Sequence, residues 1–222
     1  MEQTSPPPSK VILVAVGLTA LLTLFVIASW RSAAKRTGTV ILPGGITYLG
    51  PATPSPGSAT PALVNGKIPV SSDTKWALHE GKLFPFSFSY PASLSLGVFP
   101  DDPFDSVTIF YPGTDSQTNL FFRVENLSSQ ANQKYLGNVS EFVRNWWRSY
   151  TLWKGVEAVT QFTNAHGLTG YRTRYLDSEN KVPFEHVFFE VPNRPDLLIW
   201  ISGARFPQSV FDKLVDSVDW KL

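Results

Sequence analysis

Two adjacent tryptophans, Trp146 and Trp147, stand out among the side chains that could bind a ligand, and Arg144 and Arg148 flank them. Tryptophan and arginine are enriched at the energetic centres of binding interfaces. Neighbouring residues on a helix point about 100° apart, so both indoles can be buried only against a broad apolar surface. Either both pack on a sheet, or one lies at the rim of a binding groove. The second interpretation makes these four residues candidate binding residues.

The sequence lacks the common motifs for catalysis, metals and cofactors. Its three histidines, His79, His166 and His186, stand outside the spacings of zinc-binding motifs. There is no cysteine to act as a nucleophile or a thiolate ligand, and no nucleophile elbow, phosphate loop or dinucleotide-binding fingerprint. A pair of catalytic carboxylates has no fixed spacing in sequence, because the fold decides which ones meet. We therefore predict a protein that is not an enzyme and holds no metal and no cofactor.

The charge balance argues against a nucleic-acid partner. The whole chain has a formal net charge of +1, and the part from Lys67 onward is slightly acidic. A protein that binds nucleic acid normally carries a basic face or stripe, because phosphate contacts dominate its affinity. We expect no nucleic-acid binding.

An uncharged apolar stretch at residues 11–30 predicts a transmembrane helix, with the lipid bilayer as a partner. A helix of about 20 residues spans the hydrocarbon core, which is roughly 30 Å thick. Trp30 would lie at the interface, and the basic residues Arg31, Lys35 and Arg36 follow it. The alternative is a cleaved signal peptide, although this stretch is longer than the apolar region of a typical signal.

The expected orientation rests on opposing signals. Most of the basic residues near the apolar stretch follow it, so the positive-inside rule alone would place the C-terminal part in the cytoplasm. Long domains can cross a membrane regardless of charge, and a short tail before a signal-like stretch is typical of exported chains. We therefore expect an extracytoplasmic domain at the cell membrane, with a membrane or envelope protein as a partner.

Composition divides the chain into four segments. Residues 1–10 form a polar tail, residues 11–30 the predicted span, residues 31–66 a basic juxtamembrane and Pro/Ser/Thr-rich linker, and residues 75–222 a globular domain. A Pro/Ser/Thr-rich segment has little apolar surface to bury, so we expect it to stay extended. Within the linker, residues 40–49 place two short apolar runs around Pro-Gly-Gly, which is a hairpin signal, and a disordered, mildly apolar stretch is the alternative.

Alternating apolar residues predict a series of strands in the C-terminal domain. Phe84, Phe86, Phe88 and Tyr90 alternate with other residues, which is the period of a half-buried strand. Short turns between successive strands require antiparallel pairing. Strands are expected at residues 83–90, 94–98, 106–111, 120–127, 156–162, 168–176, 184–191, 197–202 and 218–222.

Two amphipathic helices are expected in the same domain. The first follows Asn138, an N-cap with Glu141 three residues later, and its apolar face extends from Val139 to about Leu152. The second begins near Pro207, a residue suited to a first helical turn. Each helix needs an apolar surface, which the sheet supplies. We therefore predict an α+β fold, an antiparallel β-sheet packed with two main helices.

The order of these elements resembles a known family. Residues 86–91, FSFSYP, form an early strand that ends in Tyr-Pro, and residues 211–220 join a helix to a short terminal strand. Together they resemble PsbP-like and Mog1-like α/β/α sandwich domains, in particular the small exported or membrane-tethered bacterial versions, over about residues 76–222. The resemblance implies an antiparallel sheet between helices and an accessory binding or assembly role. It implies no site residues.

The function that these observations predict is that of a membrane-anchored, non-catalytic binding or accessory module. A flexible tether would raise its local concentration near membrane partners without any catalysis. The alternative is a membrane-tethered hydrolase with an unrecognised carboxylate pair or Ser-His site. A deep pocket with convergent polar groups and perturbed titratable residues would favour the hydrolase. A third alternative, a purely structural spacer, would show neither a pocket nor an exposed aromatic patch.

Overall fold

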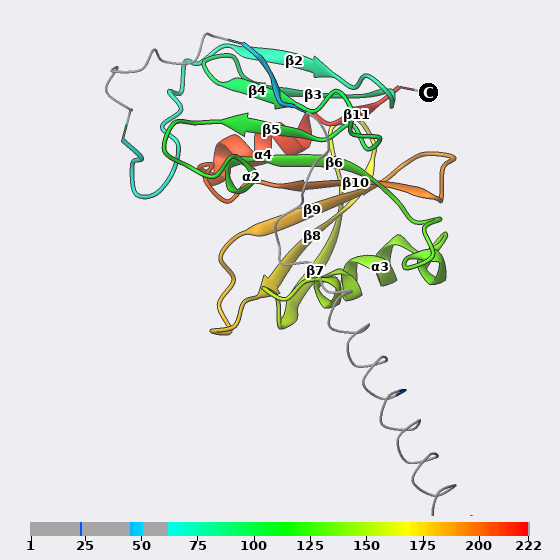
Figure 1. Cartoon of the computed structure of the whole chain (residues 1–222). Helices are drawn as coiled ribbons and strands as arrows, with labels where there is room; N and C mark the ends of the chain where they lie inside the picture. The colour runs from blue at the N-terminus through cyan, green and yellow to red at the C-terminus, as the bar shows by residue number, and fades with distance from the viewer. Residues whose placement is uncertain (1–22, 24–44, 51–61, 222) are drawn as a thin grey trace, which may run out of the picture.

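Strands make up most of the regular structure in the computed structural model, which describes Thr23, residues 45–50 and residues 62–221. They form an eight-stranded sheet in the order β1-β4-β5-β6-β10-β9-β8-β7 and a three-stranded sheet in the order β11-β3-β2 (Figure 1). Neighbouring strands are antiparallel in both sheets. In chain order the strands are β1 (Thr47–Leu49), β2 (Trp76–Glu80), β3 (Phe86–Pro91), β4 (Ser95–Val98), β5 (Val107–Phe110), β6 (Phe121–Asn126), β7 (Gly155–Thr163), β8 (Thr169–Leu176), β9 (Glu185–Glu190), β10 (Leu197–Ser202) and β11 (Asp219–Trp220).

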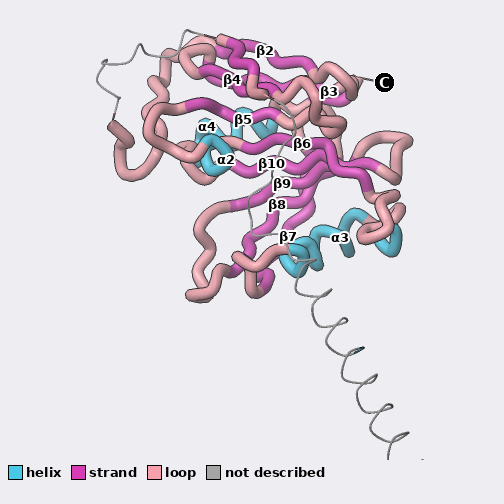
Figure 2. The backbone as a smooth tube through the Cα atoms, in the orientation of Figure 1, coloured by secondary structure: helices cyan, strands magenta, loops and turns pink. Residues whose placement is uncertain are grey.

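The helices between these strands are short (Figure 2). The side-chain oxygen of Asn138 accepts a hydrogen bond from the backbone N–H of Glu141 at 3.1 Å and so starts α3, as the capping pattern predicts. After Asn145 the chain tightens into a 3₁₀ turn and then becomes extended at Tyr150. The helical elements are α2 (Ser116–Asn119), η1 (Gln133–Tyr135), α3 (Val139–Asn145), η2 (Trp146–Ser149) and α4 (Gln208–Asp216), where η marks a 3₁₀ turn.

The predicted fold class is wrong. It expected two main helices in a PsbP/Mog1-like sandwich, but α3 has only 7 residues and α4 only 9, beside sheets of eight and three strands. The apolar face that predicted a helix over residues 139–152 is shared by α3, the turn η2 and an extended segment. A short helix can still bury large aromatic side chains on a sheet, so apolar periodicity overestimated the helix length. The described part of the chain is mainly antiparallel β-sheet.

The single-pass membrane assignment is also corrected. Among the residues that the structure describes, no helix is both long enough and apolar enough to cross a membrane. The predicted span at residues 11–30 lies outside the described residues except for Thr23, and so does the polar tail at residues 1–10.

The first core layer lies between the two sheets. Phe86 and Phe88 of β3 meet Phe122 of β6 with ring centroids 4.5 and 4.7 Å apart. Helix α4 packs into the same layer through Phe211 and other buried apolar residues. Gly203, directly after β10, permits this approach, because a Cβ atom there would lie 2.6 Å from Cδ2 of Phe211.

The second core layer lies on the opposite face of the larger sheet, beneath α3 and η2. Trp146, Tyr175 and Phe188 are buried together there. The hydroxyl of Tyr175 donates to the backbone oxygen of Val143 at 2.6 Å and ties α3 to β8. Burial raises the pKa of the Tyr175 hydroxyl, which therefore stays protonated. The short helix contacts β7 and β8, and this leaves room over one end of β9, β10 and β6.

Residues upstream of the predicted domain take part in this fold. Strand β1 pairs with β4 at the end of the larger sheet, although its residues fall within the segment expected to be a linker. Ile68 is fully buried in the first core layer, and its N–H donates to the backbone oxygen of Arg205 at 2.7 Å. Residues 40–44 of the expected hairpin lie outside the described residues.

Candidate functional site

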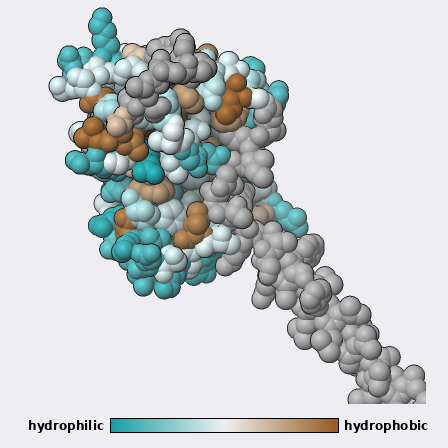
Figure 3. All heavy atoms as spheres, turned by 60° about the vertical axis from the view of Figure 1, so that its left-hand side comes forward, coloured by the Kyte–Doolittle hydropathy of each residue, from teal (hydrophilic) through white to brown (hydrophobic). Residues whose placement is uncertain are grey.

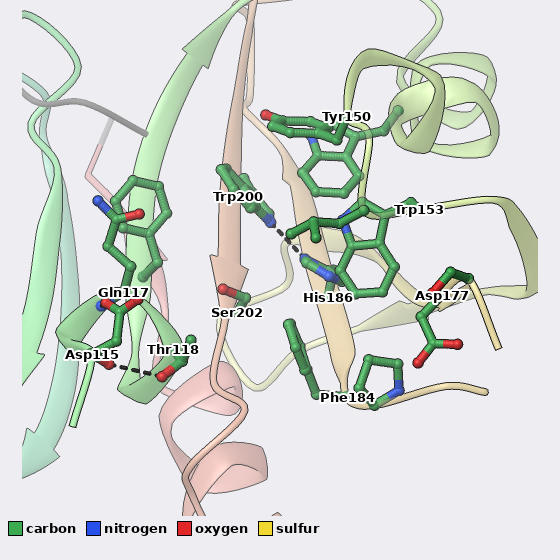
Figure 4. Close-up of a pocket in the computed structure, with 15 residues that line it drawn as sticks. Asp115, Gln117, Thr118, Tyr150, Trp153, Asp177, Phe184, His186, Trp200 and Ser202 are labelled. Carbon is green, nitrogen blue, oxygen red and sulfur yellow. Dashed lines mark hydrogen bonds between the residues drawn. The ribbon is translucent and has the colours of Figure 1, made fainter. Parts of the chain in front are cut away.

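A pocket of about 410 Å³ lies on the α3 side of the larger sheet. It lies where β6, β9 and β10 extend beyond the cover of α3 (Figure 4). Its aromatic lining consists of Phe121, Trp146, Tyr150, Trp153, Phe184 and Trp200, together with His186. Its polar lining consists of Asp115, Gln117, Thr118, Asp177, Ser178 and Ser202.

Strands form the floor of the pocket, and loops form its walls. Trp200 and Ser202 project from the same face of β10 because they are two residues apart, and Ser202 stands directly opposite His186 in the β9–β10 register. Trp153 comes from the segment between η2 and β7, and Phe184 directly precedes β9. The segment that begins α2 lies across β10 from them (Figure 4). The site thus combines residues that are distant in sequence.

The hydrogen bond between Trp200 and His186 fixes the state of the histidine. Nε1 of Trp200 donates to Nδ1 of His186 at 3.0 Å. An indole N–H can only donate, so Nδ1 must be unprotonated and the proton of the neutral ring must be on Nε2. His186 is 2% exposed, and its Nε2 has no hydrogen-bond partner among the described residues. Burial also lowers the pKa of His186 to about 3, so the ring is neutral at neutral pH.

Aromatic rings surround this histidine and hold it in place. The ring of Trp153 lies 5.2 Å from His186 and 5.6 Å from Phe184, in both cases nearly perpendicular. Trp146 lies 4.9 Å from both His186 and Trp200. Edge-to-face and offset contacts of this kind are favourable arrangements of aromatic pairs. The result is a cage of rings whose positions are set by their neighbours.

Two aspartates supply formal negative charge to the pocket lining. Oδ1 of Asp115 accepts a hydrogen bond from the N–H of Gln117 at 2.9 Å and caps α2. Oδ1 of Asp177 accepts from the N–H groups of Glu179 and Lys181 at 2.8 and 3.0 Å and shapes the loop between β8 and β9. No lysine or arginine belongs to the described lining.

Only one of the four candidate binding residues contributes to this pocket. Trp146 is buried and belongs to the pocket lining. Trp147 is half-buried, and its Nε1 donates to the backbone oxygen of Arg144 at 3.1 Å. The guanidinium of Arg148 lies 5.4 Å from the centre of the Trp147 ring. Arg144 and Arg148 are exposed, so these three residues form a separate small cluster on the surface.

Sequence reasoning missed most of the residues that build the pocket. His186, Trp153, Phe184 and Trp200 carry no motif, and their proximity depends on the pairing of β9 with β10 and on the loop path. The sequence does show many aromatic residues within residues 146–153 and within residues 184–200. Such clusters of aromatic residues are as typical of a buried core as of a binding site.

A second cavity, of about 290 Å³, lies beside His79, Asp105 and Ser106. Oδ2 of Asp105 accepts hydrogen bonds from the N–H groups of Leu83 and Phe84 at 2.6 and 3.1 Å. Oγ of Ser106 is buried without a hydrogen-bond partner among the described residues. A nucleophilic serine needs a base within hydrogen-bond reach, so this arrangement does not support a Ser-His site.

The described residues also contain no group of three or more His, Cys, Asp or Glu side chains that could hold a metal ion. Hydrophobic residues on the face drawn in Figure 3 form separate patches among hydrophilic ones. For these reasons we regard the aromatic pocket as the candidate functional site.

Comparison of the chain with protein-family models, with curated proteins and with solved structures gives no match. The resemblance to PsbP-like and Mog1-like domains, which rested on two sequence segments, is neither supported nor opposed by a match.

Proposed function

We propose that this protein is a non-catalytic binding module and that the aromatic pocket is its ligand-binding site. The observation that carries the proposal is the buried N–H of His186, which has no hydrogen-bond partner among the described residues. Leaving a buried polar group unpaired costs about 1–3 kcal/mol. A ligand with a hydrogen-bond acceptor at this position would recover that free energy.

The size and lining of the pocket support the same proposal. Pockets for small molecules typically enclose about 300–1,000 Å³ and are mostly apolar with a few polar groups. This pocket has a volume of about 410 Å³ and a mainly aromatic lining. Because the rings are fixed by mutual contacts, a ligand would lose little free energy in ordering them.

The protonation state of His186 favours binding over hydrolysis. Ser202 stands opposite His186, so the pair could suggest a Ser-His dyad. A general base must accept the serine proton on an unprotonated nitrogen. Nδ1 is already occupied by the indole N–H of Trp200, and Nε2 carries the proton.

A fragment screen monitored by NMR tests the proposal. The chain has seven tryptophans, so the 15N-labelled full chain gives one indole N–H signal for each. The library contains small neutral, cationic and anionic fragments, and we expect those that bind to shift the signals of Trp200 and Trp153. Trp153→Ala should weaken binding roughly tenfold, because aromatic contacts are worth about 1 kcal/mol or more.

Trp147→Ala is the matched control, since Trp147 is also half-buried but lies outside the pocket. It should leave the affinity unchanged. The proposal is wrong if no fragment shifts the pocket signals, or if both variants weaken binding equally.

A further inference from the structure

The formal charges of the described pocket lining have one sign. Asp115 and Asp177 are the residues with formal charge among its described lining, and they lie on opposite sides of β10 (Figure 4). Each carboxylate is held by backbone N–H groups through its Oδ1 atom. These hydrogen bonds fix the position of each carboxylate beside the pocket. An anionic ligand would be repelled from both sides, whereas a cation would be attracted from both.

The aromatic rings add to this preference. The face of an indole or phenyl ring is negative, and a cation within about 6 Å of the ring centre is attracted to it, more strongly when water is excluded. Trp153 and Phe184 are half-buried lining residues whose rings are nearly perpendicular. Trp200 supplies a third ring from the floor. A cation in the pocket beside these rings would be attracted to their π faces.

His186 adds a hydrogen-bond donor but no competing charge. Protonation of Nδ1 would direct an N–H group at the N–H group of Trp200, which lies 3.0 Å away. The contact therefore keeps the imidazole neutral. Nε2–H has no hydrogen-bond partner among the described residues, so an oxygen atom of a ligand that reaches it would be a favourable acceptor.

Given the binding function proposed above, we infer that the ligand is a small organic cation that carries both an ammonium group and a hydrogen-bond-accepting oxygen. The ammonium group lies in the pocket beside Trp153 and Phe184, between Asp115 and Asp177. The oxygen accepts a hydrogen bond from the N–H at Nε2 of His186. The ligand class includes amino alcohols and their esters.

A pair of probes with the same shape tests this inference on the full chain. Choline carries a trimethylammonium group and a hydroxyl, and 3,3-dimethyl-1-butanol is its uncharged carbon analogue. Binding of each is measured by titration of the tryptophan indole NMR signals. We expect choline to bind about tenfold more tightly than the alcohol, because only choline gains from the rings and the carboxylates.

The variants Asp115→Asn and Asp177→Asn then remove the charge from each side. Asparagine keeps the Oδ1 acceptor, so the cap of α2 and the loop after β8 are preserved. Each variant should reduce the preference for choline severalfold and leave binding of the alcohol unchanged. Asp216→Asn is the matched control, because Oδ1 of Asp216 also accepts a backbone N–H, that of Ala165, and the residue lies on α4.

The outcomes separate the ligand class from the binding function. Equal or weaker binding of choline relative to the alcohol overturns the inference of a cation, while the pocket remains a binding site. If neither choline nor the alcohol binds, the inference is also overturned. The wider fragment screen then decides whether the pocket binds ligands at all. An unchanged preference in both variants would show that the aspartates are not responsible.

Discussion

At the floor of the pocket, the burial of His186 couples the fold to pH. The pKa of His186 is lowered to about 3 by burial, whereas the pKa of histidine in an unfolded chain is about 6.5. Between these values the unfolded chain binds a proton that the folded chain does not bind. Folding stability from this group is therefore complete above about pH 6.5 and is lost as the pH falls toward about 3.

His186→Phe should reduce the pH dependence of stability. The ring shape is kept, but the titrating group is removed, so the loss of unfolding free energy between pH 7 and pH 5 should shrink by about 2 kcal/mol. Urea denaturation at the two pH values measures this difference. At pH 7 the variant should also be destabilised, because the N–H of Trp200 loses its acceptor. The same slope in variant and wild type would contradict a neutral, buried His186.

Trp146→Ala should destabilise the fold by about 3–5 kcal/mol, because the side chain is 4% exposed and fills the second core layer. The midpoint of chemical denaturation measures this effect. Trp147→Ala is the comparison, and its cost should be smaller because Trp147 is only half-buried. A midpoint for Trp146→Ala close to that of the wild type would contradict its place in the core.

At the level of single residues, the sequence alone did not separate residues of the buried core from residues of the pocket. The helical spacing of Trp146 with Phe142 and Val143 predicts burial, and the structure confirms it. The role of His186 could not be predicted, because it depends on a tryptophan fourteen residues away on the neighbouring strand. Strand register, which places the two side chains together, is a tertiary property.

Among the elements, α3 begins where the sequence predicted, but it ends at Asn145, before the predicted end near Leu152. The cap at Asn138 is local, so its sequence signal is sufficient. The helix ends at Asn145, and directly after it Trp146 and Tyr150 pack with ring centroids 4.3 Å apart. Local periodicity contains no information about that contact. Length was therefore the part of the helix prediction that failed.

Asn138→Ala should cost about 1 kcal/mol of stability, because the first turn of α3 loses the acceptor for the N–H of Glu141. Thermal unfolding measures the change. Asn138→Asp keeps an acceptor oxygen and should remain close to the wild type. If both substitutions cost the same, the cap does not contribute to stability.

Most of the strands and their antiparallel pairing were predictable, but β2 (Trp76–Glu80) was not expected and the order of the strands was not predictable. Alternation and apolar runs mark where the chain is extended. Strand β10 is buried along its whole length between β6 and β9, as its apolar run suggests. The partner of each strand, and the separation of β2, β3 and β11 into a second sheet, depend on long-range pairing that no local pattern specifies.

For the whole molecule, stability measurements can test whether the segment before β2 belongs to the cooperatively folded unit. Ile68→Ala in the full chain should cost about 2–5 kcal/mol, because Ile68 is fully buried although it precedes the first strand of the predicted domain. Val64→Ala is the control, since Val64 is 58% exposed and its truncation should change stability little. Chemical denaturation of both variants measures the effect. Similar midpoints would indicate that the segment before β2 is not part of the cooperative unit.

The smaller sheet has a consequence for the order of events during synthesis. Strand β11 lies against β3, where Trp220 pairs with Phe86 and the hydroxyl of Ser217 accepts a hydrogen bond from the N–H of Ser89. Contacts between such distant parts of a chain form late, because a long loop must first be closed. A ribosome must therefore have released most of this chain before β3 gains its second neighbour. Until then one edge of β3 lacks its partner strand, and an unpaired edge of this kind exposes the nascent protein to misfolding and to chaperones.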